Sequence, residues 1–247
     1  MYHTVKALVL RVSVYNESDS ILTLLTHEQG KLTVKARGLR RKNSPLTAPC
    51  QLFAYSEFTL FEHRGYFTIN EAHSIELFLN LRKDLQRLSL ATYFVQVAEV
   101  LSQEDMHDPD LLSLVLNCLY GMSGLDLPDN MVRAVFEMRS ACISGYFPDL
   151  GGCVRCGNTT PHRFNLSAGS LECIGCNETS VPGIRMPVTP AVLDVLRYIC
   201  YCDKRKLFSF HANEVTLARS VQITEAYLET QLERGFSALD FYKSLSL

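Results

Sequence analysis

The sequence predicts an α+β protein in which a small barrel of strands comes first and a helical body follows. Short runs of β-branched and alternating apolar residues fill roughly the first 75 positions, and the hydrophobic period then becomes helical. Two C-x2-C cysteine pairs interrupt the helical part near the middle of the chain. We therefore expect a barrel in residues 1–79, a helical domain split between 80–147 and 188–247, and an inserted cysteine-bearing module in 148–187.

The apolar content of the 247-residue chain suits a globular protein with one sizeable core or a few smaller ones. No apolar run approaches the roughly 20 residues that span a bilayer, and no apolar signal segment opens the sequence. We expect a cytoplasmic protein with no membrane partner.

Charge is distributed unevenly along the chain. Residues 1–45 hold eight Lys or Arg against three Asp or Glu, whereas the whole chain has a formal net charge of -2, which leaves about -7 for the remainder. A basic segment on an acidic body predicts that one face of the protein meets a polyanion.

Five short strands are predicted before residue 80, each ended by turn-forming residues. They cover residues 6–15, 21–26, 31–37, 52–62 and 66–72. Five strands that close on themselves are typical of an OB-fold barrel, which binds nucleic acid single strands. An SH3-like barrel is the alternative.

The third strand has one apolar and one cationic face, because Leu32, Val34 and Ala36 alternate with polar and basic residues. It runs into a loop, residues 38–45, whose glycine, proline and adjacent charges predict exposure. Basic residues on the strand and loop are the candidate DNA-binding residues: Lys31, Lys35, Arg37, Arg40, Arg41 and Lys42.

Aromatic residues are frequent in the last two strands and just before them. Such residues can stack on bases, but most aromatic side chains of a small barrel fill its core. We expect core packing for most of this set, which consists of Phe53, Tyr55, Phe58, Phe61, Tyr66 and Phe67.

The helical part is predicted from apolar periodicity and capping signals. A first helix begins near Asp84 and presents one apolar stripe: Leu85, Leu88, Ala91, Val95 and Ala98. Asp108, Asp129 and Thr189 are expected to cap three further helices, two of them with proline at the first helical position. A last helix is expected over residues 213–234.

The cysteine pairs have the spacing of a zinc site that is closed by four thiolates: Cys153, Cys156, Cys173 and Cys176. Gly157 and Asn177 follow the two pairs and tolerate the positive φ that lets a pair curl around one ion. The residues between the pairs predict a hairpin with its turn around 167–170. We expect one structural Zn2+, because four cysteines leave no open position for catalysis.

Disulfides, a redox pair and ordinary buried cysteines are the alternatives to zinc. They fit less well, because the expected compartment is reducing and a β-α-β setting for a redox C-x-x-C is missing. His162 is a possible substitute ligand, although a surface histidine is the simpler interpretation. Cys200 and Cys202 are expected to pack in a helix core, since helical neighbours two apart point in different directions.

The order of these features resembles the bacterial RecO family of recombination mediators over nearly the whole chain. No single segment is diagnostic. The most family-like parts are the four cysteines and residues 6–10, 19–26, 30–38 and 238–245.

The resemblance implies an OB-fold, a helical domain and a zinc site in a protein that binds single- and double-stranded DNA and anneals complementary strands. It also implies partnership with RecR and with the single-stranded-DNA-binding protein, so that the recombinase is loaded at gaps during repair. Such a protein would be associated with the nucleoid when bound to DNA, and the resemblance implies no catalytic residues.

Two other classes of function are considered. An enzyme is disfavoured because the sequence has no P-loop, no H-E-x-x-H and no G-x-S-x-G motif. A zinc-ribbon nucleic-acid-binding factor acting in transcription or translation is the alternative binding module.

Overall fold

The computed structural model describes residues 1–104, 106–179 and 182–245. The chain forms two compact units, one made of Met1–Asp126 with Phe236–Leu247 and the other of Leu127–Gly235. These units differ from the four segments expected from the sequence, whose division into domains stays a prediction. No helix in the described part of the chain is long and apolar enough to cross a membrane.

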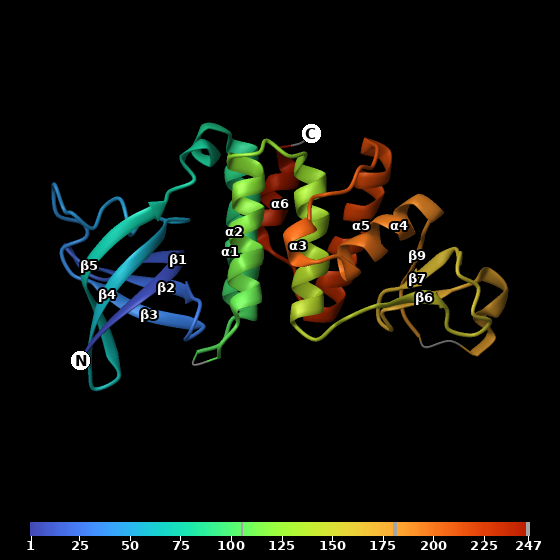
Figure 1. Cartoon of the computed structure of the whole chain (residues 1–247), viewed down its shortest axis with the longest axis horizontal. Helices are drawn as coiled ribbons and strands as arrows, with labels where there is room; N and C mark the ends of the chain where they lie inside the picture. Colours follow the sequence, from blue (N-terminus) through green and yellow to red (C-terminus); the bar gives the residue numbers. More distant parts are fainter. Residues whose placement is uncertain (105, 180–181, 246–247) are drawn as a thin grey trace. The chain divides into compact units, whose positions relative to one another are not determined.

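The first unit contains a closed five-stranded barrel (Figure 1). Its strands are β1 (Tyr2–Val14), β2 (Ser20–Thr26), β3 (Lys31–Ala36), β4 (Tyr55–His63) and β5 (Tyr66–Glu76). They close in the order β1-β2-β3-β5-β4, with β3 and β5 parallel and the other neighbours antiparallel. The expected α+β class with an N-terminal OB-fold barrel is therefore confirmed.

Alternation along the strands creates the barrel core. Leu32, Val34 and Ala36 point inward from β3, and Phe58 and Leu60 do so from β4. The barrel is thus filled by its own apolar side chains, whose burial stabilises it.

The six barrel aromatics divide between inside and outside. Phe53 and Phe58 are buried, Tyr55 and Phe67 are half-buried, and the remaining two, Phe61 and Tyr66, are exposed. Most of the set therefore packs in or against the core, as expected, and Phe61 and Tyr66 are the exceptions, because their positions in the register of β4 and β5 turn them outward.

Three α-helices complete the first unit: α1 (Leu85–Leu101), α2 (Pro109–Ser123) and α6 (Ser237–Ser244), with the short 3-10 helix η1 (Leu79–Lys83) before them. Asp84 caps α1 and Asp108 caps α2 with side-chain oxygens that accept backbone N–H groups. The expectation that one apolar stripe of α1 is buried was wrong at the start of the helix, where Leu85 is 57% exposed. Tyr93 and Phe94 are buried instead, because α1 contacts the barrel, α2 and α6 on different sides.

The second unit is built on α3 (Asp129–Ile143), α4 (Pro190–Tyr201) and α5 (Glu214–Leu232). Thr189 caps α4 as expected, and Asn213 caps α5 through its side-chain oxygen. The expected Asp129 cap was wrong: Asp129 is the first helical residue, and Pro128 precedes it without a side-chain cap.

Between α3 and α4 the chain forms a small four-stranded sheet in the order β6-β8-β7-β9. Its strands are β6 (Asp149–Cys153), β7 (Arg163–Asn165), β8 (Ser170–Glu172) and β9 (Arg185–Pro187), with the 3-10 segment η2 (Ile174–Thr179) after β8. Another 3-10 helix, η3 (Lys204–Lys206), follows α4. The cysteine-bearing segment is therefore inserted between helices, as expected.

A buried ionic cluster joins α3 to α5. Arg133 Nε donates to Glu137 Oε1 at 2.8 Å, and Arg133 Nη2 donates to Glu225. Thr224 Oγ1 donates to the other oxygen of Glu137 at 2.6 Å. Burial raises the pKa of Glu137 to about 7, against the pull of Arg133. Such a satisfied cluster fixes the register of two helices without adding much stability.

Candidate metal centre and nucleic-acid surface

Local backbone geometry shapes the first cysteine pair. Gly157 adopts φ 71°, and its N–H donates to the carbonyl of Cys153 at 2.9 Å. This left-handed residue lets the chain curl so that the sulfurs of Cys153 and Cys156 face the same point. The glycine that follows the first cysteine pair is therefore needed for its positive φ, as the sequence predicted.

The predicted hairpin brings the second pair beside the first. Strands β7 and β8 are antiparallel, with Phe164 opposite Leu171, and β8 lies next to β6. In the second pair, the Cys176 N–H donates to the carbonyl of Cys173 at 3.1 Å.

The four cysteine sulfurs form a cluster that can hold one metal ion. All four lie within 4.8 Å of one another, and the Cys156 and Cys173 sulfurs are 3.8 Å apart. Tetrahedral coordination at a metal–sulfur distance of about 2.3 Å places sulfurs about 3.8 Å apart, so the cluster fits such an ion. Among the described residues, His162 is outside this group.

Backbone donors prepare Cys153 to bind a cation. N–H groups of Cys156, Arg155 and Cys173 are directed at its sulfur, the last at 3.3 Å, and lower its pKa to about 6. The lowered pKa favours the thiolate, which is the form that binds metal ions.

Arg197 of α4 anchors the cysteine-bearing segment. Its Nε donates to the carbonyl of Leu150 at 2.8 Å, and its Nη2 donates to the carbonyl of Thr159 at 2.8 Å. Sequence reasoning missed this residue, because its partners are backbone oxygens that no motif marks.

Cys200 and Cys202 lie outside the four-cysteine group that the described residues form. Cys200 is buried as predicted, and its sulfur is 4.0 Å from that of Cys142. Cys202 is half-buried, and its sulfur accepts from Arg139 Nη2 at 3.4 Å.

Lys31 and Lys35, which are candidate DNA-binding residues on β3, contact other parts of the protein. Lys31 Nζ donates to the carbonyl of Glu99 at 3.1 Å. Lys35 Nζ lies 3.1 Å from a carboxylate oxygen of Asp19 and 4.6 Å from the ring centre of Tyr15. These lysines contribute positive charge from fixed positions.

The other four candidates are exposed on and beside the loop after β3. Arg37, Arg41 and Lys42 lie together along a groove of about 610 Å³ that β5 lines on the opposite side. Arg40 Nη1 donates to the carbonyl of Asn16 at 2.7 Å. The structure therefore gathers three of these cations at one groove and ties the fourth to the loop after β1.

Asp19 holds the base of this basic loop, and sequence reasoning missed that role. Its carboxylate accepts from the Gly38 N–H at 2.9 Å and pairs with Lys35. The Gly38 N–H is the main cause that holds the pKa of Asp19 well below its usual range, helped by Lys35, Asn16 and Ser18. The negative charge of Asp19 therefore stabilises the folded loop through Gly38 and Lys35.

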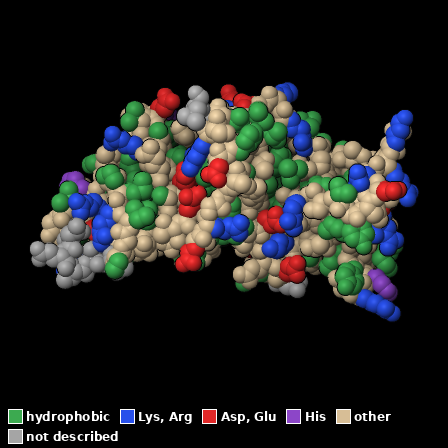
Figure 2. Space-filling view, turned by 180° about the vertical axis from the view of Figure 1, so that it is seen from behind, with side chains coloured by type: hydrophobic (Ala, Val, Ile, Leu, Met, Phe, Trp, Pro, Cys, Tyr) green, Lys and Arg blue, Asp and Glu red, His purple; other side chains and the backbone are tan. Residues whose placement is uncertain are grey.

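Basic side chains are not gathered everywhere on the surface. On the face shown in Figure 2, Lys and Arg side chains are interspersed with Asp and Glu side chains.

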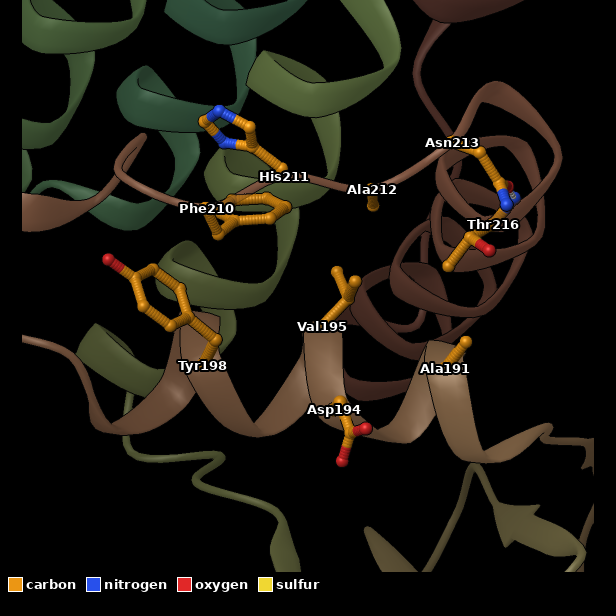
Figure 3. Close-up of a pocket in the computed structure, with 9 residues that line it drawn as sticks. All are labelled: Ala191, Asp194, Val195, Tyr198, Phe210, His211, Ala212, Asn213 and Thr216. Carbon is orange, nitrogen blue, oxygen red and sulfur yellow. Dashed lines mark hydrogen bonds between the residues drawn. The ribbon is translucent and has the colours of Figure 1, made fainter.

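The second unit has a hollow of about 420 Å³ between α4 and the segment that leads into α5. Tyr198 and Phe210 pack at one end of it, with ring centres 5.1 Å apart. In Figure 3, His211 and Asp194 point in opposite directions. They therefore form no acid–base pair in this hollow.

The fold and sites define an OB-fold protein with a helical body and a four-cysteine group that could hold a metal ion. The chain belongs to the recombination protein O (RecO) family. The family model described as "Recombination protein O N terminal" matches residues 1–78, and that described as "Recombination protein O C terminal" matches residues 82–240.

Curated relatives agree with this assignment over nearly the full chain. The "DNA repair protein RecO" of Acetivibrio thermocellus is 31% identical over 246 residues, which cover 99% of this chain and 97% of the relative. The protein of the same name from Desulforudis audaxviator is 32% identical over 244 residues, covering 98% and 96%. That of Alkaliphilus metalliredigens is 30% identical over 240 residues, covering 96% and 97%. This chain is a RecO-family DNA repair protein.

Proposed function

We propose that this protein is a DNA-binding recombination mediator that binds single- and double-stranded DNA, anneals complementary strands and helps load the recombinase at gaps. One observation carries the proposal: an exposed basic loop borders a groove on a closed OB-fold barrel, in a chain that matches both RecO family models. When bound to DNA, such a cytoplasmic protein is associated with the nucleoid.

The loop is suited to contact phosphates. Arg37, Arg40, Arg41 and Lys42 are exposed, and cations of this kind neutralise phosphates and release counterions whatever the base sequence. Lys31 and Lys35 add to the local potential while keeping their protein partners.

Annealing follows from the same charges. Two complementary strands repel each other through their phosphates, and a cationic groove lowers that repulsion while it holds a strand close to its partner. Unwinding would consume a nucleotide, whereas annealing is downhill and needs none. We therefore propose a non-catalytic mechanism, consistent with a sequence that has no P-loop.

We further propose that the four-cysteine group binds one structural zinc ion. Cysteines 153, 156, 173 and 176 would hold it through their sulfurs, which fill all four positions of a tetrahedral site. The ion would therefore hold the second unit's small sheet to its loops and would not activate water.

The partners proposed for this mediator are RecR and the single-stranded-DNA-binding protein. Family membership supports this expectation. Co-elution of the purified proteins on a sizing column, with and without DNA, measures both contacts directly. Separate elution of the partners at micromolar concentrations under all conditions would contradict it.

A fluorescence annealing assay tests the proposal. Complementary oligonucleotides coated by their cognate single-stranded-DNA-binding protein should anneal faster with the protein, equally with and without ATP. Replacing Arg40 and Arg41 by Ala should reduce the acceleration. The pair Arg205→Ala and Lys206→Ala, exposed on the other unit, removes the same charge as a control. Strict ATP dependence, or no acceleration at any protein concentration, would count against the mediator.

A further inference from the structure

Four ring-bearing residues form an exposed patch on the barrel, which we call the aromatic patch: Tyr2, Phe61, His63 and Tyr66. Tyr2 is 62% exposed, Phe61 40% and Tyr66 79%. A single exposed aromatic residue is ordinary, but neighbouring ones on one surface mark a site of interaction.

Strand register places these rings on one outer face. Tyr2 of β1 lies opposite Phe61 of β4, and His63 of β4 lies opposite Tyr66 of β5. Phe61 and His63 are two residues apart, so their side chains leave the same side of the strand. The ring centres of Tyr2 and Phe61 are 5.2 Å apart, and those of Phe61 and His63 are 6.5 Å apart with planes inclined by only 6°.

A tight turn adds a cation to the patch. Arg64 and Gly65 join β4 to β5 with φ values of 52° and 78°, both in the left-handed region that a two-residue hairpin turn requires. The turn leaves Arg64 exposed between His63 and Tyr66 in the sequence. The rings are therefore accompanied by positive charge.

The aromatic patch is continuous with the basic side of the barrel. Phe61 lies opposite Thr68 of β5, and Thr68 lies beside Lys35 of β3. Phe61 and Lys35 therefore lie two strands apart across the sheet, at a backbone separation of about 10 Å. Further along β4 and β5, away from the turn, Glu71 lies opposite Thr59. This acidic residue marks the end of the aromatic patch in that direction.

We propose that the aromatic patch is a stacking platform for the unpaired bases of single-stranded DNA. The inference rests on the DNA binding proposed above and adds the part of the surface that distinguishes single strands from duplexes. Charge complementarity favours this occupant, because the exposed Arg64 adjoins the rings of His63 and Tyr66 in the sequence and matches a polyanion. Only a single strand offers free base faces to rings, since duplex bases are stacked on one another.

A tryptophan reporter tests the stacking directly. The chain contains no Trp, so Tyr66→Trp creates a single indole fluorophore at a position that is 79% exposed. Adding oligo(dT) should quench its emission, because a base stacks on the ring, while an equal concentration of duplex should leave it nearly unchanged. Unchanged emission at saturating oligo(dT) would overturn the inference.

A matched pair of substitutions measures the contribution to affinity. Tyr66→Ala should weaken oligo(dT) binding about tenfold, within the range for removal of one stacked base, and should leave duplex affinity and the salt slope unchanged. Tyr66→Phe retains the ring and should bind like the wild type. Equal weakening for oligo(dT) and duplex, or equal weakening by the Phe variant, would contradict base stacking.

The outcomes separate this inference from the proposed function. Wild-type protein that binds DNA with a strong salt dependence, together with unquenched indole emission from the Tyr66→Trp variant, would remove the stacking platform alone. Wild-type protein that binds no DNA at low salt would remove both. Indole emission that changes with protein concentration in the absence of DNA would show that a second copy of the chain covers the patch, which also overturns the inference.

Discussion

The barrel and the four-cysteine segment carry their functional groups in opposite ways. The barrel is filled by side chains such as Leu24, Val34 and Phe58, while its cations and exposed rings lie on the outside. The strands β7, β8 and β9 of the cysteine-bearing sheet have three residues each, and the sulfurs of the four cysteines lie within 4.8 Å of one another. The functional groups of the barrel therefore lie outside the core that stabilises it, whereas the proposed zinc site would make the four cysteines the main source of stability of their segment.

This contrast predicts the largest effect for loss of a cysteine ligand. Cys153→Ser or Cys173→Ser should reduce zinc from one per chain to near zero and unfold the residues around the small sheet, since structural zinc contributes about 10 kcal/mol or more of apparent binding energy. Metal analysis and thermal melts measure this. Cys202→Ala, outside the four-cysteine group, is the control.

The zinc prediction can fail in a clear way. Wild-type protein prepared without chelator and found to contain almost no zinc would contradict it, since a closed four-thiolate site holds the ion tightly at neutral pH.

A core substitution in the barrel should have the next largest effect. Phe58→Ala removes a fully buried ring and should cost about 3–5 kcal/mol of unfolding free energy, while the zinc content stays at one per chain. Thr33→Ala, on the exposed face of β3, should change stability by less than about 0.5 kcal/mol. Denaturant unfolding with zinc analysis checks both, and zinc loss in the Phe58 variant would show that the two regions depend on each other.

Substitution of the basic loop should change binding without changing folding. Arg40→Ala with Arg41→Ala should weaken all DNA sequences alike and lower the salt slope by roughly one for each phosphate that the protein no longer neutralises. The melting temperature should be nearly that of the wild type. Binding isotherms at several salt concentrations measure the slope, and an unchanged slope would place the DNA site elsewhere.

The smallest effect is expected at Asp19, whose carboxylate holds the loop. Because its pKa is lower in the folded than in the unfolded protein, the stability it contributes is present at neutral pH, above the unfolded value of about 3.9, and is lost as pH falls towards the folded value. Asp19→Asn should remove this part of the acid dependence. Thermal melts from pH 7 to pH 3 test it, and parallel curves for the two proteins would contradict it.

Features encoded by neighbouring residues could be predicted from the sequence. Each cysteine pair is local, Gly157 marks the turn after the first pair, and Asp108 or Thr189 caps its own helix through backbone a few residues away. The five strands were located for the same reason, because alternation is a local pattern.

Features that depend on residues far apart in the sequence could not be predicted from it. The short helix α6 was missed, because its buried residues, including Leu239, are specified by packing on α1. The role of Asp19 in holding the basic loop could not be predicted, since its main partner is the Gly38 N–H on another segment. The exposure of Phe61 depends on the register of β4 with β5, which shifts between Thr59 and Leu60.

The salt dependence of DNA affinity, measured on wild-type and metal-stripped protein, tests most directly that the two regions have separate roles. We predict that stripping the metal lowers the stability of the second unit but leaves the slope of log affinity against log salt for single-stranded DNA unchanged, because the phosphate contacts are on the barrel. A slope that falls on metal removal as far as it does on replacement of Arg40 and Arg41 would contradict this account and assign phosphate contacts to the cysteine segment.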